Sequence, residues 1–164
     1  MRIRTAALLG AAGLAAVVWA TGFPSRVGLT RSQAAISLPG DLVVPMADVI
    51  VDRAILVDAP PALVWRALER AFAHVERETV LYEEAGDCLV LAAALPGLDD
   101  EDERPSSCAL ALLPEANERT RIHLRERHLS TQDMPAWLIK AALAVEAPAA
   151  MLMLRDIKAA AEAL

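Results

Sequence analysis

The last predicted strand of the chain, Thr120 to His128, carries ionisable side chains that are able to transfer protons or to bind a polar group of a ligand. Successive residues of a strand point to opposite faces, so Glu126 and His128 share a face with Ile122 and Leu124. The apolar pair directs this face toward the interior, with Glu126 and His128 near one end of it. The arginines of the strand coat the outer face. In a functional interpretation, the inward carboxylate and imidazole form a polar end to an apolar pocket and orient a ligand's carboxylate or hydroxyl. In a structural interpretation, they belong to an ion pair or to an exposed rim.

Two residues outside this strand join the candidate site. Arg53 shares a strand face with Val51 and Ile55, and a buried guanidinium needs a partner, for which Glu126 is available. Trp65 lies on the following helix, where it either lines a pocket or anchors the helix in the core. The candidate ligand-binding residues are therefore Arg53, Trp65, Glu126 and His128, and no catalytic residue is assigned.

Several site classes find no support in the sequence. The spacing of His74, His123 and His128 does not make a metal site, and no Cys-x-x-Cys pair, nucleophile elbow or phosphate-binding glycine loop is present. We expect no metal and no cofactor. The acidic run from Asp99 to Glu103 lacks the alternating ligands of a calcium loop and is predicted to be a solvated hairpin tip. A net charge of −6 argues against nucleic acid as a partner.

The two cysteines are predicted to be free. If Ala94 lies opposite Ser107 in a hairpin, Cys108 faces about Ala93, and Cys88 lies some five residues further along. At about 3.3 Å per residue, this separation exceeds the roughly 7 Å limit between bridged Cα atoms. We therefore expect two buried or half-buried thiols.

The elements that position these residues are organised around Arg53 to Trp65, a strand that runs through a turn into an amphipathic helix. Pro60 and Pro61 end the strand, and Pro61 suits the first helical position. Alternation and helical spacing predict strands and helices in this order: strand 49–57, helix 61–73, strands 78–83, 88–94, 107–113 and 120–128, and a helical region from 134 onward. Pro148 is predicted to split that region into a helix near 136–145 and a second one to about 163.

The N-terminus is apolar and begins with basic residues. The run from Ala6 to Phe23 contains no charge, and its length is at the lower edge of what spans a bilayer. It is either a transmembrane anchor, with Arg2 and Arg4 on the cytoplasmic side and the domain outside, or a signal peptide with a small residue at Ala20. The expected division is an anchor or signal peptide at 1–23, a connector at 24–47 and a globular domain at 48–164.

Short motifs in a fixed order resemble a known family. Leu38-Pro-Gly-Asp, Val44-Pro, Arg53-Ala-Ile with Asp58-Ala-Pro-Pro, and Val64-Trp are similar to motifs of the SRPBCC proteins (START-like, polyketide cyclase/dehydrase-type) common in actinobacteria. The C-terminal stretch from Glu146-Ala-Pro to Glu162 looks like their closing helix. The resemblance covers about residues 38–164. One departure is a shortened middle region: Phe72 to Glu78 leads almost directly to the next strand, without the Gly-, Trp- and Tyr-rich stretch of such proteins.

The resemblance implies an α+β helix-grip fold, in which an antiparallel sheet curls around the C-terminal helix with an apolar cavity between them. It implies binding of a small hydrophobic molecule, such as a lipid, sterol or polyketide, although a minority of such proteins catalyse cyclisation or dehydration. The function expected here is binding without catalysis. Because of the departure, a smaller or more open pocket, or none, is expected. Two alternatives remain: a polyketide cyclase/dehydrase-like enzyme, and a truncated relative with a structural or protein-interaction role. The expected partners are the hydrophobic molecule and, through the N-terminal helix, a membrane.

Overall fold

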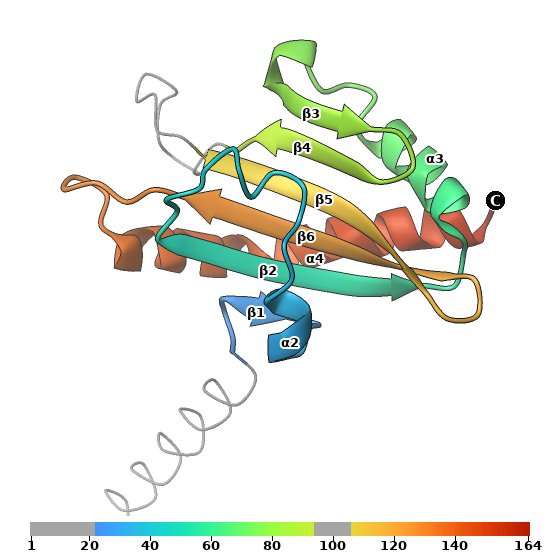
Figure 1. Cartoon of the computed structure of the whole chain (residues 1–164), viewed down its shortest axis with the longest axis horizontal. Helices are drawn as coiled ribbons and strands as arrows, with labels where there is room; N and C mark the ends of the chain where they lie inside the picture. Colours follow the sequence, from blue (N-terminus) through green and yellow to red (C-terminus); the bar gives the residue numbers. More distant parts are fainter. Residues whose placement is uncertain (1–21, 94–105) are drawn as a thin grey trace, which may run out of the picture.

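The structure, a computed structural model, describes residues 22–93 and 106–164. The predicted N-terminal hydrophobic helix and the acidic hairpin tip lie outside the described residues, apart from Gly22 and Phe23. The described chain is α+β, with one six-stranded mixed sheet and a long C-terminal helix, as a helix-grip fold requires (Figure 1). The elements are β1 (Arg26–Val27), α2 (Arg31–Ala34), β2 (Val49–Val57), α3 (Pro61–Ala71), a 3-10 turn (Arg77–Thr79), β3 (Val80–Glu84), β4 (Cys88–Ala92), β5 (Ser106–Glu115), β6 (Arg119–His128) and α4 (Ala136–Glu162).

The sheet has the strand order β1-β2-β6-β5-β4-β3. The pairs among β2 to β6 are antiparallel, as predicted, whereas the short β1 pairs in parallel with β2. Each of the strands expected from alternation is present, with ends that agree to within two residues. The three-residue turn between β5 and β6 (residues 116–118) has Asn117 and Glu118 at positive φ (62° and 54°), a backbone conformation typical of short hairpin connections.

The inner face of the sheet forms the main core with α3 and the C-terminal half of α4. Leu110, Leu112, Ile122 and Leu124 point toward the helices and meet Leu154 and Ile157 of α4. From α3, the core receives Val64, Trp65 and Leu68, which recur at helical spacing. A smaller cluster joins Val49 and Val51 of β2 to Ile139 and Leu143 in the N-terminal half of α4.

The split predicted at Pro148 is wrong, because α4 runs without interruption from Ala136 to Glu162 through the proline. Both halves of the helix are fixed to the sheet, by Ile139 and Leu143 before Pro148 and by Leu154 and Ile157 after it. These tertiary contacts override the local cost of one missing backbone hydrogen bond. Among the described residues, α4 is also the one helix long and apolar enough to cross a membrane.

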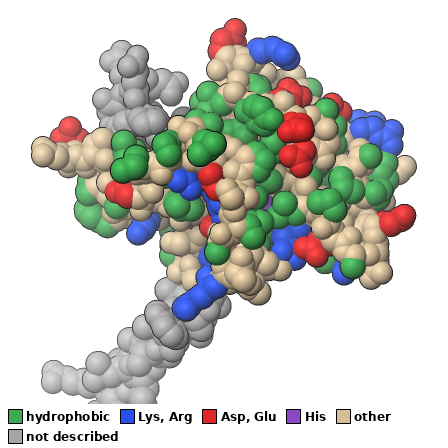
Figure 2. All heavy atoms as spheres, in the orientation of Figure 1, with side chains coloured by type: hydrophobic (Ala, Val, Ile, Leu, Met, Phe, Trp, Pro, Cys, Tyr) green, Lys and Arg blue, Asp and Glu red, His purple; other side chains and the backbone are tan. Residues whose placement is uncertain are grey.

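The outer face of the sheet is covered by the segment between β1 and β2, which crosses it in Figure 1. Leu38 packs with Cys88 and Ala111, and Val44 is 2% exposed. Gly40 has a φ of +91°, and a Cβ there would lie 3.0–3.2 Å from Val90 and Ala109 side chains. Glycine therefore allows both the turn and the close approach of this segment to the sheet. The space-filling view of this face shows apolar side chains interspersed with charges of both signs (Figure 2).

Both cysteines are free, as predicted. The predicted register was wrong by two residues, since Ser107 pairs with Ala92 and Cys108 with Leu91. Cys88 pairs with Ala111 and belongs to the outer face, whereas Cys108 packs against the inner core.

Candidate functional site

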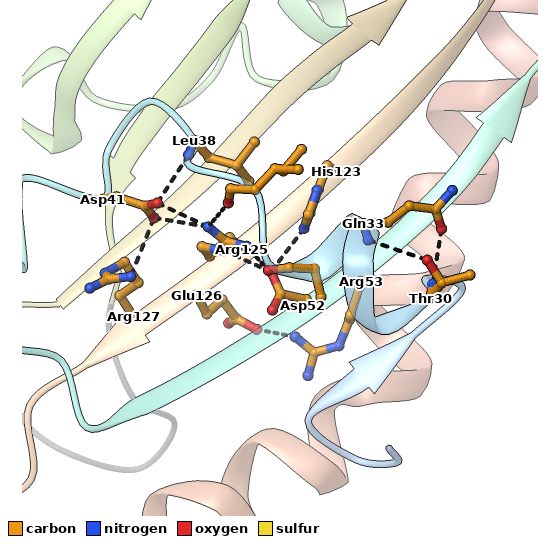
Figure 3. Close-up of polar contacts among 12 residues, drawn as sticks. Thr30, Gln33, Leu38, Asp41, Asp52, Arg53, His123, Arg125, Glu126 and Arg127 are labelled. Atoms are coloured by element: carbon orange, nitrogen blue, oxygen red, sulfur yellow. Dashed lines mark hydrogen bonds and ion pairs between the residues drawn. The ribbon is translucent and has the colours of Figure 1, made fainter. Parts of the chain in front are cut away.

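Arg53 and Glu126 form an ion pair on the inner face of the sheet, as the shared strand faces predicted (Figure 3). The Arg53 side chain is fully buried and that of Glu126 is 15% exposed. Arg53 Nη2 also donates to the backbone carbonyl of Leu143, at 2.8 Å. This guanidinium therefore joins β2, β6 and α4, and its Nε is buried without a partner in the part of the chain that the structure describes. We call Arg53, Glu126 and His128 the inner polar cluster.

His128 lies on the same face as Glu126, where it pairs with Val49 of β2 and Ser106 of β5. It is 1% exposed, and neither ring nitrogen has a hydrogen-bond partner among the described residues. Burial, together with the positive charge of Arg53, lowers the pKa of His128 to about 4. The imidazole is therefore neutral at physiological pH, one buried nitrogen being a donor and the other an acceptor.

Burial also raises the pKa of the two acidic groups beside Arg53, the Glu126 carboxyl and the Cys108 thiol. It raises the pKa of the Glu126 carboxyl above its usual range, and the negative charge of Glu146 acts in the same direction, while Arg53 opposes both. Cys108, which pairs with Glu126 across the strands, has its pKa raised to about 12 by burial and by the Glu126 charge. A thiol with such a pKa is protonated and unreactive in the folded protein.

Trp65 lines a pocket of about 210 Å³ on the inner side of the sheet, away from the inner polar cluster. The pocket opens between the end of α3 and the β3–β4 edge. Apolar side chains make up most of its wall: Trp65, Leu68, Phe72, Ala73, Val75, Val80, Leu89 and Leu91. Glu69, Arg77 and Glu83 are the charged residues in its lining. The wall residue Leu91 is separated from Glu126 by the intervening strand β5, where Cys108 pairs with both.

The structure brings three of the four predicted residues to one place on the inner face and leaves Trp65 apart from them, at the separate pocket. Arg53 and Glu126 are in contact, and His128 follows on the same strand face. Trp65 is 6% exposed in the core and also lines the pocket, and its role in ligand binding stays a prediction. The pocket itself was not predicted from individual residues, because its wall is made by side chains that read as ordinary core positions.

A second polar cluster lies on the outer face, where the sequence predicted arginines coating the surface. Arg125 is instead only 4% exposed, because residues 34–41 cover it. Its Nε donates to Asp52 Oδ1 at 2.7 Å, and the same oxygen lies 2.8 Å from His123 Nε2 (Figure 3). The Asp41 carboxylate forms ion pairs with Arg125 Nη1 at 2.9 Å and with Arg127 Nη1 at 3.3 Å. We call Asp41, Asp52, His123, Arg125 and Arg127 the outer polar cluster.

The outer polar cluster fastens the connector to the sheet. Besides Asp41, Arg125 binds the backbone carbonyls of Ala34 and Ile36, and Arg127 binds that of Val44. A shallow pocket of about 330 Å³ at this junction is lined in part by Arg125 and Arg127. In the described ranges, no group of three or more His, Cys, Asp and Glu residues is arranged to hold a metal ion. The signal in the sequence for this cluster was Asp41 in the Leu38-Pro-Gly-Asp motif.

Comparison with known proteins gives the fold and little more. No family model and no curated protein matches the sequence. Protein MLL2253 from Mesorhizobium loti has a solved structure that aligns with a TM-score of 0.50 at 14% identity, over 68% of this chain and 95% of that one. The Zhui aromatase/cyclase from Streptomyces sp. R1128 aligns at 19% identity with a TM-score of 0.42, over 69% and 93%. TTHA0849 from Thermus thermophilus aligns at 19% identity with a TM-score of 0.42, over 70% of this chain and 97% of that one.

Proposed function

We propose that this protein binds a small hydrophobic molecule in the pocket between α3 and the β3–β4 edge of the sheet. The observation that carries the proposal is the pocket wall, which combines two aromatic and six aliphatic side chains with charged residues in the same lining. Ligand pockets have this composition, because apolar contacts supply affinity and a few polar groups fix orientation. Trp65 is the candidate residue that contacts the ligand directly.

The volume of the pocket limits the ligand. About 210 Å³ is below the roughly 300–1,000 Å³ of pockets that enclose drug-sized ligands. A single ring system or a short acyl chain fits this space, whereas a whole sterol or polyketide would extend past Glu69 and Glu83 into solvent. The core residues Leu110, Leu124 and Leu154 fill the space between the sheet and the C-terminal half of α4.

The inner polar cluster has a supporting role in this proposal. Arg53 and Glu126 neutralise each other, and Arg53 uses its second terminal nitrogen to hold Leu143 of α4. These contacts fix α4 on the sheet and so keep the inner face closed at the end where His128 lies. An acid–base role in a cyclase-like reaction would need these groups to reach the ligand, and Cys108 stands between Glu126 and the pocket wall.

We further propose that the apolar segment up to Phe23 anchors the protein in a membrane, with the domain outside the cytoplasm. Only Pro24 and Ser25 separate Phe23 from β1, the edge strand of the sheet. At about 3.5 Å per residue, such a link keeps the edge of the sheet within about 10 Å of the bilayer surface. A hydrophobic ligand could then enter the protein directly from the lipid.

The binding proposal is tested by native mass spectrometry of the full chain, released from detergent after incubation with dodecanoic acid and with a naphthalene-based probe. A one-to-one adduct that is lost on denaturation is the expected result. Ala73→Phe fills the pocket from its exposed wall and should weaken the adduct about tenfold.

Ala116→Phe is the matched control, since Ala116 is also an exposed alanine outside the helices, in the β5–β6 turn. Equal binding by the parent chain and by both variants would place the ligand elsewhere. No adduct with either probe would reject a working pocket of this kind.

A further inference from the structure

The helix α4 is apolar on both of its sides, although its own chain covers only one. Leu143 and Leu154 face the sheet and are at most 1% exposed, whereas Val145 and Leu152 are 82% and 56% exposed on the outward side. The outward face carries no charge over four turns, and consists of Leu138, Ala141, Val145, Pro148, Ala149 and Leu152. Helices that are apolar all round are normally covered all round. An exposed apolar face of this length therefore indicates an interaction surface.

The outward face is symmetric about Val145. Leu138 and Leu152 each lie seven residues from it, and Ala141 and Ala149 each lie four residues from it. Two helical turns take 7.2 residues, so Leu138, Val145 and Leu152 lie along one line of the helix to within about 20°. A two-fold axis between the two Val145 residues places Leu138 of each copy opposite Leu152 of the other, which is the reciprocal contact that a self-complementary interface needs. We propose that two copies of this chain pair through α4 in antiparallel orientation.

The alanines set how closely the two helices approach. Helix axes can lie about 8 Å apart where small side chains meet, and Ala141 of each copy would face Ala149 of the other. A groove of about 630 Å³ between α3 and α4 lies beside this face, lined by Ala67, Ala71, Ala149, Leu152 and Met153 among others. In the antiparallel pair, Leu138 of the second copy enters this groove next to Leu152.

The charged and aromatic residues at the edge of the face also fit a second copy. Trp137 is 69% exposed and Arg155 is exposed on the same flank of α4, eight residues before and ten residues after Val145. The antiparallel pairing brings Arg155 of one copy beside Trp137 of the other, and does so twice by symmetry. A guanidinium over an indole ring is an attractive cation–π arrangement.

A bilayer is a poorer match for this face. Helices that lie on membranes have bulky apolar side chains on one face and lysines or arginines along its flanks. Here the face is rich in alanine, and Glu146 and Asp156 accompany Arg155 near it. If both copies share one membrane, their anchors raise the effective concentration of one α4 helix around the other. An interface of one helix pair, at the low end of stable interface areas of about 1,200 Å² in total, is then sufficient for dimerisation.

The test is disulfide cross-linking of the full chain in phosphatidylcholine vesicles. With Val145→Cys, the two sulfurs meet at the two-fold axis, and at least tenfold more covalent dimer should form than with Lys140→Cys. Lys140 is exposed on the same helix but lies about 140° around the axis from Val145. The unsubstituted chain, with Cys88 and Cys108, gives the background. Equal cross-linking of both variants, or none with either, overturns the proposal.

A second measurement separates a partner copy from the bilayer. Single-molecule photobleaching of the labelled full chain should show two steps for the parent and for Lys140→Glu, and one step for Val145→Glu. Val145 is 82% exposed, so this substitution leaves the fold of the protomer unchanged. If brominated lipids instead strongly quench the fluorescence of Trp137 in a background with Trp19→Phe and Trp65→Phe, the face belongs to the bilayer, and the pairing is refuted.

Discussion

The buried, neutral His128 should make the stability of the fold depend on pH in a calculable way. Its pKa is about 4 in the folded protein and about 6.5 in the unfolded chain. As the pH falls, the unfolded chain binds a proton first, so the contribution of His128 is complete above about pH 6.5 and is lost between pH 6.5 and 4. At about 1.4 kcal/mol per pH unit, the full loss is about 3 kcal/mol, of which about 2 kcal/mol is lost by pH 5.

The assay is urea unfolding of the full chain in lipid nanodiscs at pH 7, 6 and 5, followed by tryptophan fluorescence. We compare the parent with His128→Leu and His128→Gln, so that the other titrating groups cancel in the difference. Between pH 7 and pH 5, the parent should lose about 2 kcal/mol more of its free energy of unfolding than either variant. The glutamine variant separates ionisation from packing, because it keeps a polar side chain that does not titrate. Parallel pH profiles for all three proteins would refute a buried neutral histidine.

Three further predictions concern the rest of the sheet. Asp52→Ala removes a carboxylate that binds the buried Arg125, and urea unfolding should show a loss of about 3 kcal/mol, whereas an unchanged midpoint would mean that the outer polar cluster is solvated. Gly40→Ala places a Cβ 3.0 Å from Val90 at a positive φ, so thermal unfolding should show a loss of at least about 1 kcal/mol, and a gain would contradict the close approach. Cys108, with a pKa of about 12, should resist iodoacetamide at pH 8 until urea unfolds the chain, and rapid labelling of the native protein would show that it is accessible.

The inner face of the sheet could be predicted from the sequence because strand alternation is a local property. Ile122 and Leu124 determine which face of β6 turns inward, and this choice carries Glu126 and His128 with it. The same alternation in β2 places Arg53 on that face. The ion pair then follows, because a buried guanidinium without a carboxylate costs too much free energy to persist.

The outer face could not be predicted in the same way, because alternation shows which side chains share a face and not what covers it. Arg125 and Arg127 read as solvent-exposed, since polar outer faces usually are. Their burial depends on residues 34–44, more than 80 positions earlier in the chain. Pro148 shows the converse limit: its local effect on a helix is predictable, but the contacts that hold both halves of α4 on the sheet are long-range.

The register of β2 links the two polar clusters through the sheet. Asp52 and Arg53 are adjacent in the chain and therefore point to opposite faces. Asp52 holds Arg125 and, through it, the connector that follows β1, whereas Arg53 holds Glu126 and α4. A slip of one residue would exchange the two faces and leave both buried charges opposite the wrong partners. Charges in the centre of a buried strand thus fix one register, and the same strand couples the segment next to the predicted membrane anchor to the helix that carries the proposed dimer interface.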